Sequence, residues 1–338
     1  MNKTTIATTA LLLLLTASCS NDKEISENPN NPSTAQQVEI RLTSSLATTR
    51  AYTSTQATQL TAGQAVYAWV DDHGLGTEHV KAWTLTCQTD QSLSGTNKYY
   101  FPASGYTVDV YAVHGNFTAT EGTTAWTTFN TGLTHSVETD QTVAGNLEKS
   151  DLLFARETDL ARNNNAKTLH FAHELSKIEV YLVAGSGLVD TDITNATVKL
   201  LNVLPTANVT LSKSGTPDAT ITAGGTATTI STRMQYATDV TVNVGTTADP
   251  NMQNAYAFGE AIIVPQYFDT AYDGTGAAQQ FLEVDMPSGV KLYTSIKRQF
   301  EKGKKYSYNV TVNSTDLVLT STISDWDDAG TENVQTDS

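Results

Sequence analysis

Cysteine and charge are both scarce in this sequence. Its 338 residues include two cysteines, too few for the disulfide framework of a small secreted domain. Charged residues make up 16% of the chain, against about 25% in a typical globular protein. The 20 lysines and arginines face 35 acidic residues, which gives a net charge of −15. This balance argues against nucleic acid as a partner and excludes a polybasic membrane anchor, because both need clustered cations.

Long apolar runs are rare, and the one at the N-terminus is short. Ala10–Leu15 contains five consecutive leucines, whereas a helix needs about 20 apolar residues to span a bilayer. With Lys3 before it, Met1–Ser18 is typical of a signal peptide. Small residues then lead to Cys19, which resembles a bacterial lipobox. We expect Cys19 to be acylated and to become the new N-terminus. The alternative is an ordinary secretory signal cut near Ala17.

The residues after the lipobox indicate a surface-exposed lipoprotein. Residues 19–37 are polar and form a predicted flexible tether. The acidic pair Asp22 and Glu24 resembles a surface-export signal of Bacteroidetes lipoproteins. Acylation of Cys19 would leave Cys87 without an intrachain partner, so we expect Cys87 to be a small buried side chain in a strand. The predicted location is the cell surface, with the lipid on Cys19 in the outer membrane.

Threonine and alternating apolar residues favour an all-β fold. Threonine contributes 56 of the 338 residues, and its β-branched side chain favours strands. Only 150–161 has a weak helical pattern, and the continuous apolar run Ala261–Val264 is typical of a strand buried on both faces. The segments with the period-2 pattern of a half-buried strand are Val38–Leu46, Val66–Val70, Tyr106–Val113, Lys177–Val183, Tyr306–Val312 and Leu317–Ile323, and we also expect strands at Thr197–Leu204 and Gln279–Met286.

The length predicts about two domains. A polar stretch that includes Asn163-Asn164-Asn165 marks the expected boundary. We therefore predict one β-sandwich at residues 38–165, a second at 166–330, and a tail at 331–338.

The sequence shows no catalytic or metal-binding constellation. His170 and His173 are the one close histidine pair, and their spacing suits zinc on a helix, whereas in a strand the two side chains point to opposite faces. The clustered aspartates fit solvated turns. A nucleophile elbow, a phosphate-binding loop and a dinucleotide fingerprint are absent from the sequence. We predict no enzyme, no cofactor and no bound metal.

Five further segments carry a family resemblance when they are taken in order behind Cys19. They are Ser150–Ala155, Phe171–Val180, Ala261–Gln266, Phe300–Val312 and Ile323–Trp326. Together they resemble the fimbrillin and Mfa-like lipoproteins of Bacteroidales, which are subunits of type V pili. The resemblance spans most of the chain after residue 38, and it implies two tandem transthyretin-like β-sandwich domains in a fimbrium.

The resemblance also implies a route of maturation. An arginine-specific protease removes the first strand of the lipidated precursor, and a strand from the next subunit fills the groove. The segment 38–50 contains the first strand and ends at Arg50, the candidate end of the propeptide, so we predict cleavage between Arg50 and Ala51. The candidate donor is the C-terminal strand 317–323, with Leu317, Leu319 and Ile323 entering successive pockets. The alternative is that this strand completes the sheet of its own domain.

Three functions follow from these expectations. The first is a structural fimbrial subunit that assembles with other subunits by strand exchange and supports adhesion or biofilm formation. The second is a pilus anchor that keeps its first strand and stays lipidated at Cys19. The third is a surface lipoprotein that binds host or bacterial glycans or proteins and never assembles.

Overall fold

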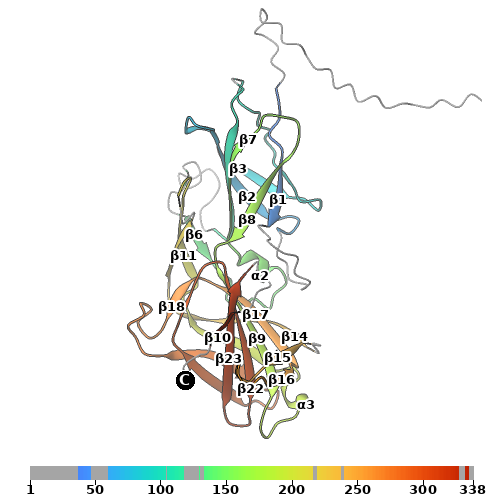
Figure 1. Ribbon diagram of the computed structural model, residues 1–338, viewed down its shortest axis with the longest axis vertical. Helices are drawn as coiled ribbons and strands as arrows, with labels where there is room; N and C mark the ends of the chain where they lie inside the picture. Colours follow the sequence, from blue (N-terminus) through green and yellow to red (C-terminus); the bar gives the residue numbers. More distant parts are fainter. Residues whose placement is uncertain are drawn as a thin grey trace, which may run out of the picture. The chain divides into compact units, whose positions relative to one another are not determined.

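The all-β prediction is confirmed by the computed structural model (Figure 1). It describes residues 37–46, 60–103, 105–117, 129, 133–215, 219–236, 240–326 and 332–334. The described residues, from 37 on, form one compact unit. Helices in the described part are short, and they are α2 (Asn146–Lys149) and α3 (Asp190–Ile193). None of the helices among these residues is long and apolar enough to cross a membrane.

Seven strands in the first half of the unit close into a barrel. In order around the barrel they are β1 (Leu42–Leu46), β4 (Ser92–Ser94), β3 (Thr77–Cys87), β2 (Ala65–Asp72), β5 (Val108–His114), β7 (Leu153–Leu160) and β8 (Lys167–His173). Strand β1 completes the ring, because it is antiparallel to β4 and parallel to β8. A closed sheet has no free edge.

The remaining strands form larger and smaller sheets. A six-stranded sheet has the order β14 (Arg233–Tyr236), β17 (Ala257–Ile263), β9 (Ser176–Ala184), β22 (Lys304–Val312), β23 (Leu317–Asp325) and β24 (Glu332–Val334). A four-stranded sheet has the order β13 (Thr228–Ser231), β10 (Thr197–Val203), β19 (Gln279–Asp285) and β20 (Lys291–Ile296). The smaller groups are β12 (Ala219–Gly224), β11 (Thr206–Leu211) and β6 (Leu133–Ser136); β15 (Thr241–Asn243) and β16 (Met252–Asn254); and β18 (Gln266–Phe268) and β21 (Arg298–Phe300).

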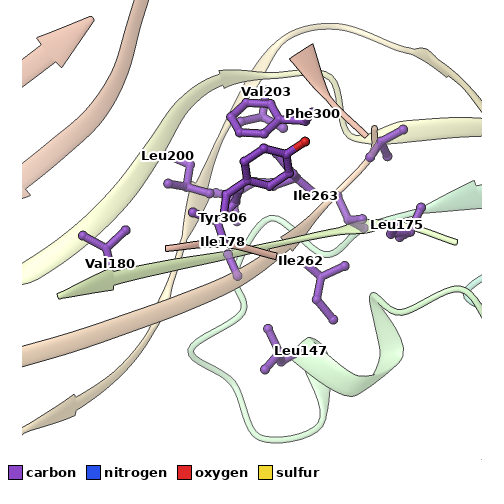
Figure 2. Close-up of a cluster of buried hydrophobic side chains, with 14 of the residues drawn as sticks. Leu147, Leu175, Ile178, Val180, Leu200, Val203, Ile262, Ile263, Phe300 and Tyr306 are labelled. Carbon is purple, nitrogen blue, oxygen red and sulfur yellow. The ribbon is translucent and has the colours of Figure 1, made fainter. Parts of the chain in front are cut away.

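The main hydrophobic core involves the six-stranded and four-stranded sheets. Figure 2 shows Ile178 and Val180 of β9 near Tyr306 of β22, with Leu200 and Val203 of β10 beside them. All seven residues of β17 are buried, as expected for the apolar run 261–264. A separate cluster fills the barrel and includes buried residues of β1, β3, β5 and β8.

The segment 150–161, which has a weak helical pattern, is mostly a strand. Helix α2 ends before it, and residues 153–160 form β7, which pairs with β5 and β8. Burial of Leu153, Phe154 and Ala155 in the strand outweighs a local preference for helix. The polar segment 161–166 connects β7 to β8 inside the same barrel. The division into domains at residue 165 stays a prediction.

Two buried tyrosines of β22 differ in how their hydroxyls are satisfied. The Tyr306 hydroxyl accepts from the Glu301 N–H at 2.8 Å and donates to the Gln299 carbonyl at 3.2 Å. The Tyr308 hydroxyl is fully buried and has no hydrogen-bond partner among the described residues. Burial raises the pKa of both phenols, so both stay neutral.

We therefore expect opposite effects when the two hydroxyls are deleted. Tyr308→Phe removes an unsatisfied polar group and should raise the free energy of unfolding by up to about 1 kcal/mol. Tyr306→Phe leaves a backbone donor and acceptor unpaired and should lower it by about 1–2 kcal/mol. Urea denaturation of both variants provides the measurement, and each serves as the control for the other. A destabilised Tyr308→Phe variant would mean that its hydroxyl is satisfied.

Candidate functional site

Strand β1 is hydrogen-bonded along both edges. On one side Leu42–Leu46 pairs in parallel with Lys167–Phe171 of β8. On the other side β1 is antiparallel to β4, and the Ser44 N–H donates to the Gln91 carbonyl at 2.8 Å. Figure 1 shows β1 in blue beside β8 in green. Removal of β1 would unpair two barrel edges at once, and each would expose backbone donors and acceptors.

From Ile40 into β1, the chain presents two apolar side chains and then a serine to the barrel interior. Ile40 and Leu42 are each 2% exposed and belong to the barrel core, and Ser44 is 8% exposed. Between them, Arg41 is exposed and Thr43 is half-buried. This alternation is the period-2 pattern of a strand with one buried face. Without β1, the barrel would have two apolar pockets and one small polar pocket in a row.

The polar pocket, which we call the Ser44 slot, is formed by Leu60, Cys87 and Gln91. The Ser44 hydroxyl donates to Gln91 Oε1 at 2.9 Å and lies 3.8 Å from Cys87 Sγ. The Gln91 amide group donates in turn to the Leu60 carbonyl at 3.2 Å. The Ser44 slot therefore fits a small side chain with a hydroxyl.

Cys87 is the buried side chain that we expected. It is 1% exposed, and burial raises the pKa of its thiol, so the thiol is neutral and unreactive. Its position under β1 was not predicted, because Cys87 and Ser44 are distant in the sequence and no local pattern joins them. The alternation along 38–46 does place Ser44 on the buried face, so the sequence predicts that Ser44 is buried but not that it contacts Cys87.

The predicted lipidation and processing residues lie outside the described residues. Cys19 belongs to 1–36, and Arg50 and Ala51 belong to 47–59. Arg50 follows the last residue of β1 by four positions. Lipidation of Cys19 and cleavage between Arg50 and Ala51 stay predictions.

The candidate donor strand lies in the sheet of its own chain. All nine residues of β23 pair with β22, from Leu317 opposite Val312 to Asp325 opposite Lys304. Leu317, Leu319 and Ile323 are partly buried and pack against the main core. On its other edge, the pairing of β23 with β24 spans Ser321–Ile323. In this structure β23 completes the six-stranded sheet of its own chain. Its role as a donor strand stays a prediction.

Trp326 ties the end of β23 to the barrel strand β8. Its indole is 7% exposed and stacks on the His173 imidazole, with ring centres 4.0 Å apart and 6° between the planes. His173 Nδ1 lies 2.8 Å from the Asp151 carboxylate. Burial alone would raise the pKa of Asp151, but the neighbouring His173 holds it below its ordinary value. This contact was missed at the sequence level, because Trp326 and His173 are far apart in the chain.

The charged residues of Phe171–Val180 are buried and paired. Each of three residues in this segment contacts an acidic or basic side chain from another part of the chain. Such pairs fix geometry more than they stabilise the fold, since burying each charge is costly. The pairs are His173 with Asp151 at 2.8 Å, Glu174 with Lys302 at 2.7 Å and Lys177 with Glu260 at 2.9 Å.

The histidine pair divides as expected for a strand. His170 is exposed and contacts Glu157 at 2.7 Å, whereas His173 is buried against Asp151. The two imidazoles thus face different carboxylates. In the described ranges no group of three or more His, Cys, Asp or Glu side chains could hold a metal ion.

Comparison with solved structures gives the fold. One similar structure is a candidate cell adhesion protein from Bacteroides uniformis, with 21% identity, 86% of this chain and 99% of that chain covered, and a TM-score of 0.57. A second, from Bacteroides ovatus, has 16% identity, coverage of 86% and 98%, and a TM-score of 0.54. The tip fimbrial protein Mfa3 from Porphyromonas gingivalis has 9% identity, coverage of 86% and 100%, and a TM-score of 0.47.

Comparison with protein families covers most of the described unit. No match is found among curated proteins. The family model for fimbrillin-like proteins matches residues 49–326, which include six of the seven barrel strands and the candidate donor strand. The chain therefore belongs to the fimbrillin-like family.

Proposed function

We propose that this chain is a structural subunit of a cell-surface fimbria of the type V kind. The precursor is lipidated on Cys19 and carried to the outer membrane. A protease then cuts between Arg50 and Ala51, β1 leaves the barrel, and a strand from the next subunit takes its place. The resulting filament supports adhesion or biofilm formation, and the subunit is not an enzyme.

The position of β1 is the observation that carries this proposal. It closes the barrel through hydrogen bonds on both edges and through a buried face, and it precedes Arg50 by four residues. The fimbrillin-like match begins at residue 49, beside the predicted cut. After β1 leaves, a strand that arrives from another copy would find two unpaired edges and a row of pockets already arranged, which is what strand addition requires.

The two alternative functions, a pilus anchor and a glycan-binding lipoprotein, predict different states of β1 and of the surface aromatic residues. A pilus anchor would keep β1 in place and stay acylated at Cys19. A glycan-binding lipoprotein would present aromatic side chains on its surface. Trp69, Trp83 and Trp326 are at most 7% exposed, so these three indoles do not form such a surface.

We expect mature subunits sheared from cells to begin at Ala51. Mass spectrometry of the N-terminus in sheared and outer-membrane fractions provides the measurement. Arg50→Ala should abolish the cut and leave uncut chains in the membrane fraction, because an arginine-specific protease needs that side chain. Arg41→Ala is the matched control, since Arg41 is exposed within the first strand and should not affect processing.

Two results would contradict this assignment. Shortened, polymerised subunits from the Arg50→Ala variant would show that another bond is cut. An acylated Cys19 terminus in all fractions of the unaltered chain would mean that β1 is retained and that the protein is an anchor or a surface binding module.

Cys87 should report directly on the departure of β1. In a chain that begins at Ser20, Cys87 is the one cysteine, and β1 covers it. Cleavage by an arginine-specific protease should raise the rate of its reaction with a maleimide by at least about tenfold, since the thiol no longer requires local unfolding to be reached.

The urea-denatured chain gives the upper limit of that rate, and Cys87→Ser gives the background. A cleaved chain in which Cys87 still reacts at the rate of the intact chain would show that β1 stays seated after the cut. The strand-exchange proposal would then fail.

A further inference from the structure

A cleft of about 460 Å³ lies between strand β12 and the strand pair β18–β21. On β12 it is lined by Ile221–Ala223, and on the strand pair by Tyr267, Gln299 and Phe300. Its volume falls in the range of about 300–1,000 Å³ that is usual for small-molecule sites. None of these strands belongs to the barrel, so the cleft is separate from the groove that removal of β1 would open.

Tyr267 offers an aromatic surface in this cleft. It is 44% exposed, although its neighbours Gln266 and Phe268 in β18 are buried. A Cβ added at Gly274 would come within 3.2 Å of the Tyr267 ring, so the Gly274 backbone lies directly against that ring. The ring is therefore supported by the chain while much of it stays exposed, and little side-chain freedom is lost when a ligand packs on it.

The loop after β18 is fixed by a buried carboxylate. The Asp269 carboxylate accepts from the Ala271 N–H and the Gly276 N–H at 3.0 Å each. Tyr272, which also lines the cleft, has a φ of 59°, in the left-handed region that non-glycine residues seldom adopt. Its hydroxyl donates to the Asn202 carbonyl at 2.7 Å and holds it there. Strained backbone that its surroundings hold in place is common at ligand sites.

Uncharged hydrogen-bonding groups lie beside the aromatic ring. Gln299 is the cross-strand partner of Tyr267 in the antiparallel pair β18–β21, so both side chains project from the same face. Gln299 and Thr222 are exposed, and both line the cleft. An amide group and a hydroxyl can each donate and accept hydrogen bonds, and a purely apolar partner would leave both without one. The cleft therefore suits a ligand that combines an apolar surface with hydroxyl groups.

The charges at the cleft disfavour an anionic ligand. The charged residues of its lining are Glu301 and Lys302. Lys302 Nζ lies 2.7 Å from the carboxylate of the buried Glu174, so the lysine charge is already balanced. Glu301 is exposed, and the whole chain has a net charge of −15, which repels phosphate, sulfate and carboxylate groups. A neutral ligand is favoured.

We propose that this cleft binds a neutral saccharide, with one sugar ring on Tyr267 and sugar hydroxyls hydrogen-bonded to Gln299 and Thr222. A pyranose has an apolar C–H face and a rim of hydroxyl groups, which match the aromatic ring and the polar side chains beside it. The inference names a partner class for adhesion, and in that respect it rests on the proposed function. Saccharide binding does not require β1 to leave, because the cleft lies outside the barrel.

Saccharide binding by the intact chain tests the proposal. The chain begun at Ser20 is applied to an array of neutral oligosaccharides of hexoses and N-acetylhexosamines, with sialylated and sulfated forms beside them. We expect binding to neutral oligosaccharides, and calorimetric titration of the strongest one gives its Kd. Tyr267→Ala should raise that Kd by at least about tenfold, because the stacking surface is lost. Gln299→Ala should raise it by about threefold or more, because a hydrogen bond is lost.

Tyr293→Ala is the matched control for Tyr267→Ala. Tyr293 is exposed to nearly the same extent, 43%, but it lies on β20 and does not line the cleft. This variant should bind the oligosaccharide as tightly as the unaltered chain. Tyr267→Phe keeps the ring and should keep most of the affinity. Gln299→Ala changes an exposed side chain, so it keeps the test decisive if Tyr267→Ala does not fold.

The outcomes separate the saccharide site from the proposed function. Full binding by both Tyr267→Ala and Gln299→Ala would place the saccharide elsewhere and overturn the site. Binding restricted to sialylated or sulfated forms would overturn the neutral class. An intact chain that binds no oligosaccharide, while sheared subunits begin at Ala51, would overturn the site and leave the fimbrial proposal standing. Binding through Tyr267 by a chain that keeps an acylated Cys19 in all fractions would support the site and overturn strand exchange.

Discussion

The two-sided pairing of β1 is the constraint on which the rest of the structure depends. A barrel has no edge only while each strand has two neighbours, and β1 is the strand that joins β4 to β8. The buried side chains of Ile40, Leu42 and Ser44 add apolar packing and a side-chain hydrogen bond to these backbone bonds. The barrel is thus complete with β1 and would have two open edges without it.

The buried ion pairs and the Trp326 contact join the barrel strand β8 to the strands that follow it. The segment Phe171–Val180 runs from β8 into β9, and its buried charges are each held by a partner. Trp326, directly after the end of β23, packs on the buried His173 of this segment. The candidate donor strand is therefore fastened at its C-terminal end, while its own half-buried leucines are less well covered than the residues of β1.

Local patterns predicted individual strands well and their partners poorly. Alternation located β2, β9 and β22, and the apolar run at 261–264 indicated a strand buried on both faces, because these signals are carried by neighbouring residues. The weak helical pattern at 150–161 does not decide the conformation there, because β7 pairs on both sides. The parallel pairing of β1 with β8, the contact of Ser44 with Cys87 and the stacking of Trp326 on His173 join distant residues, and no period in the sequence encodes them. Cys19, Arg50 and Ala51 come from motif and resemblance, and they stay predictions.

The distance along the chain between β1 and β8 has a consequence for how the molecule is made. Thr43 and its neighbour Thr168 are 125 positions apart, so their pairing requires the closure of a long loop. Contacts of such separation form late in folding. Because β1 is synthesised first and β8 ends at His173, the barrel cannot close until about half of the 338 residues have been synthesised.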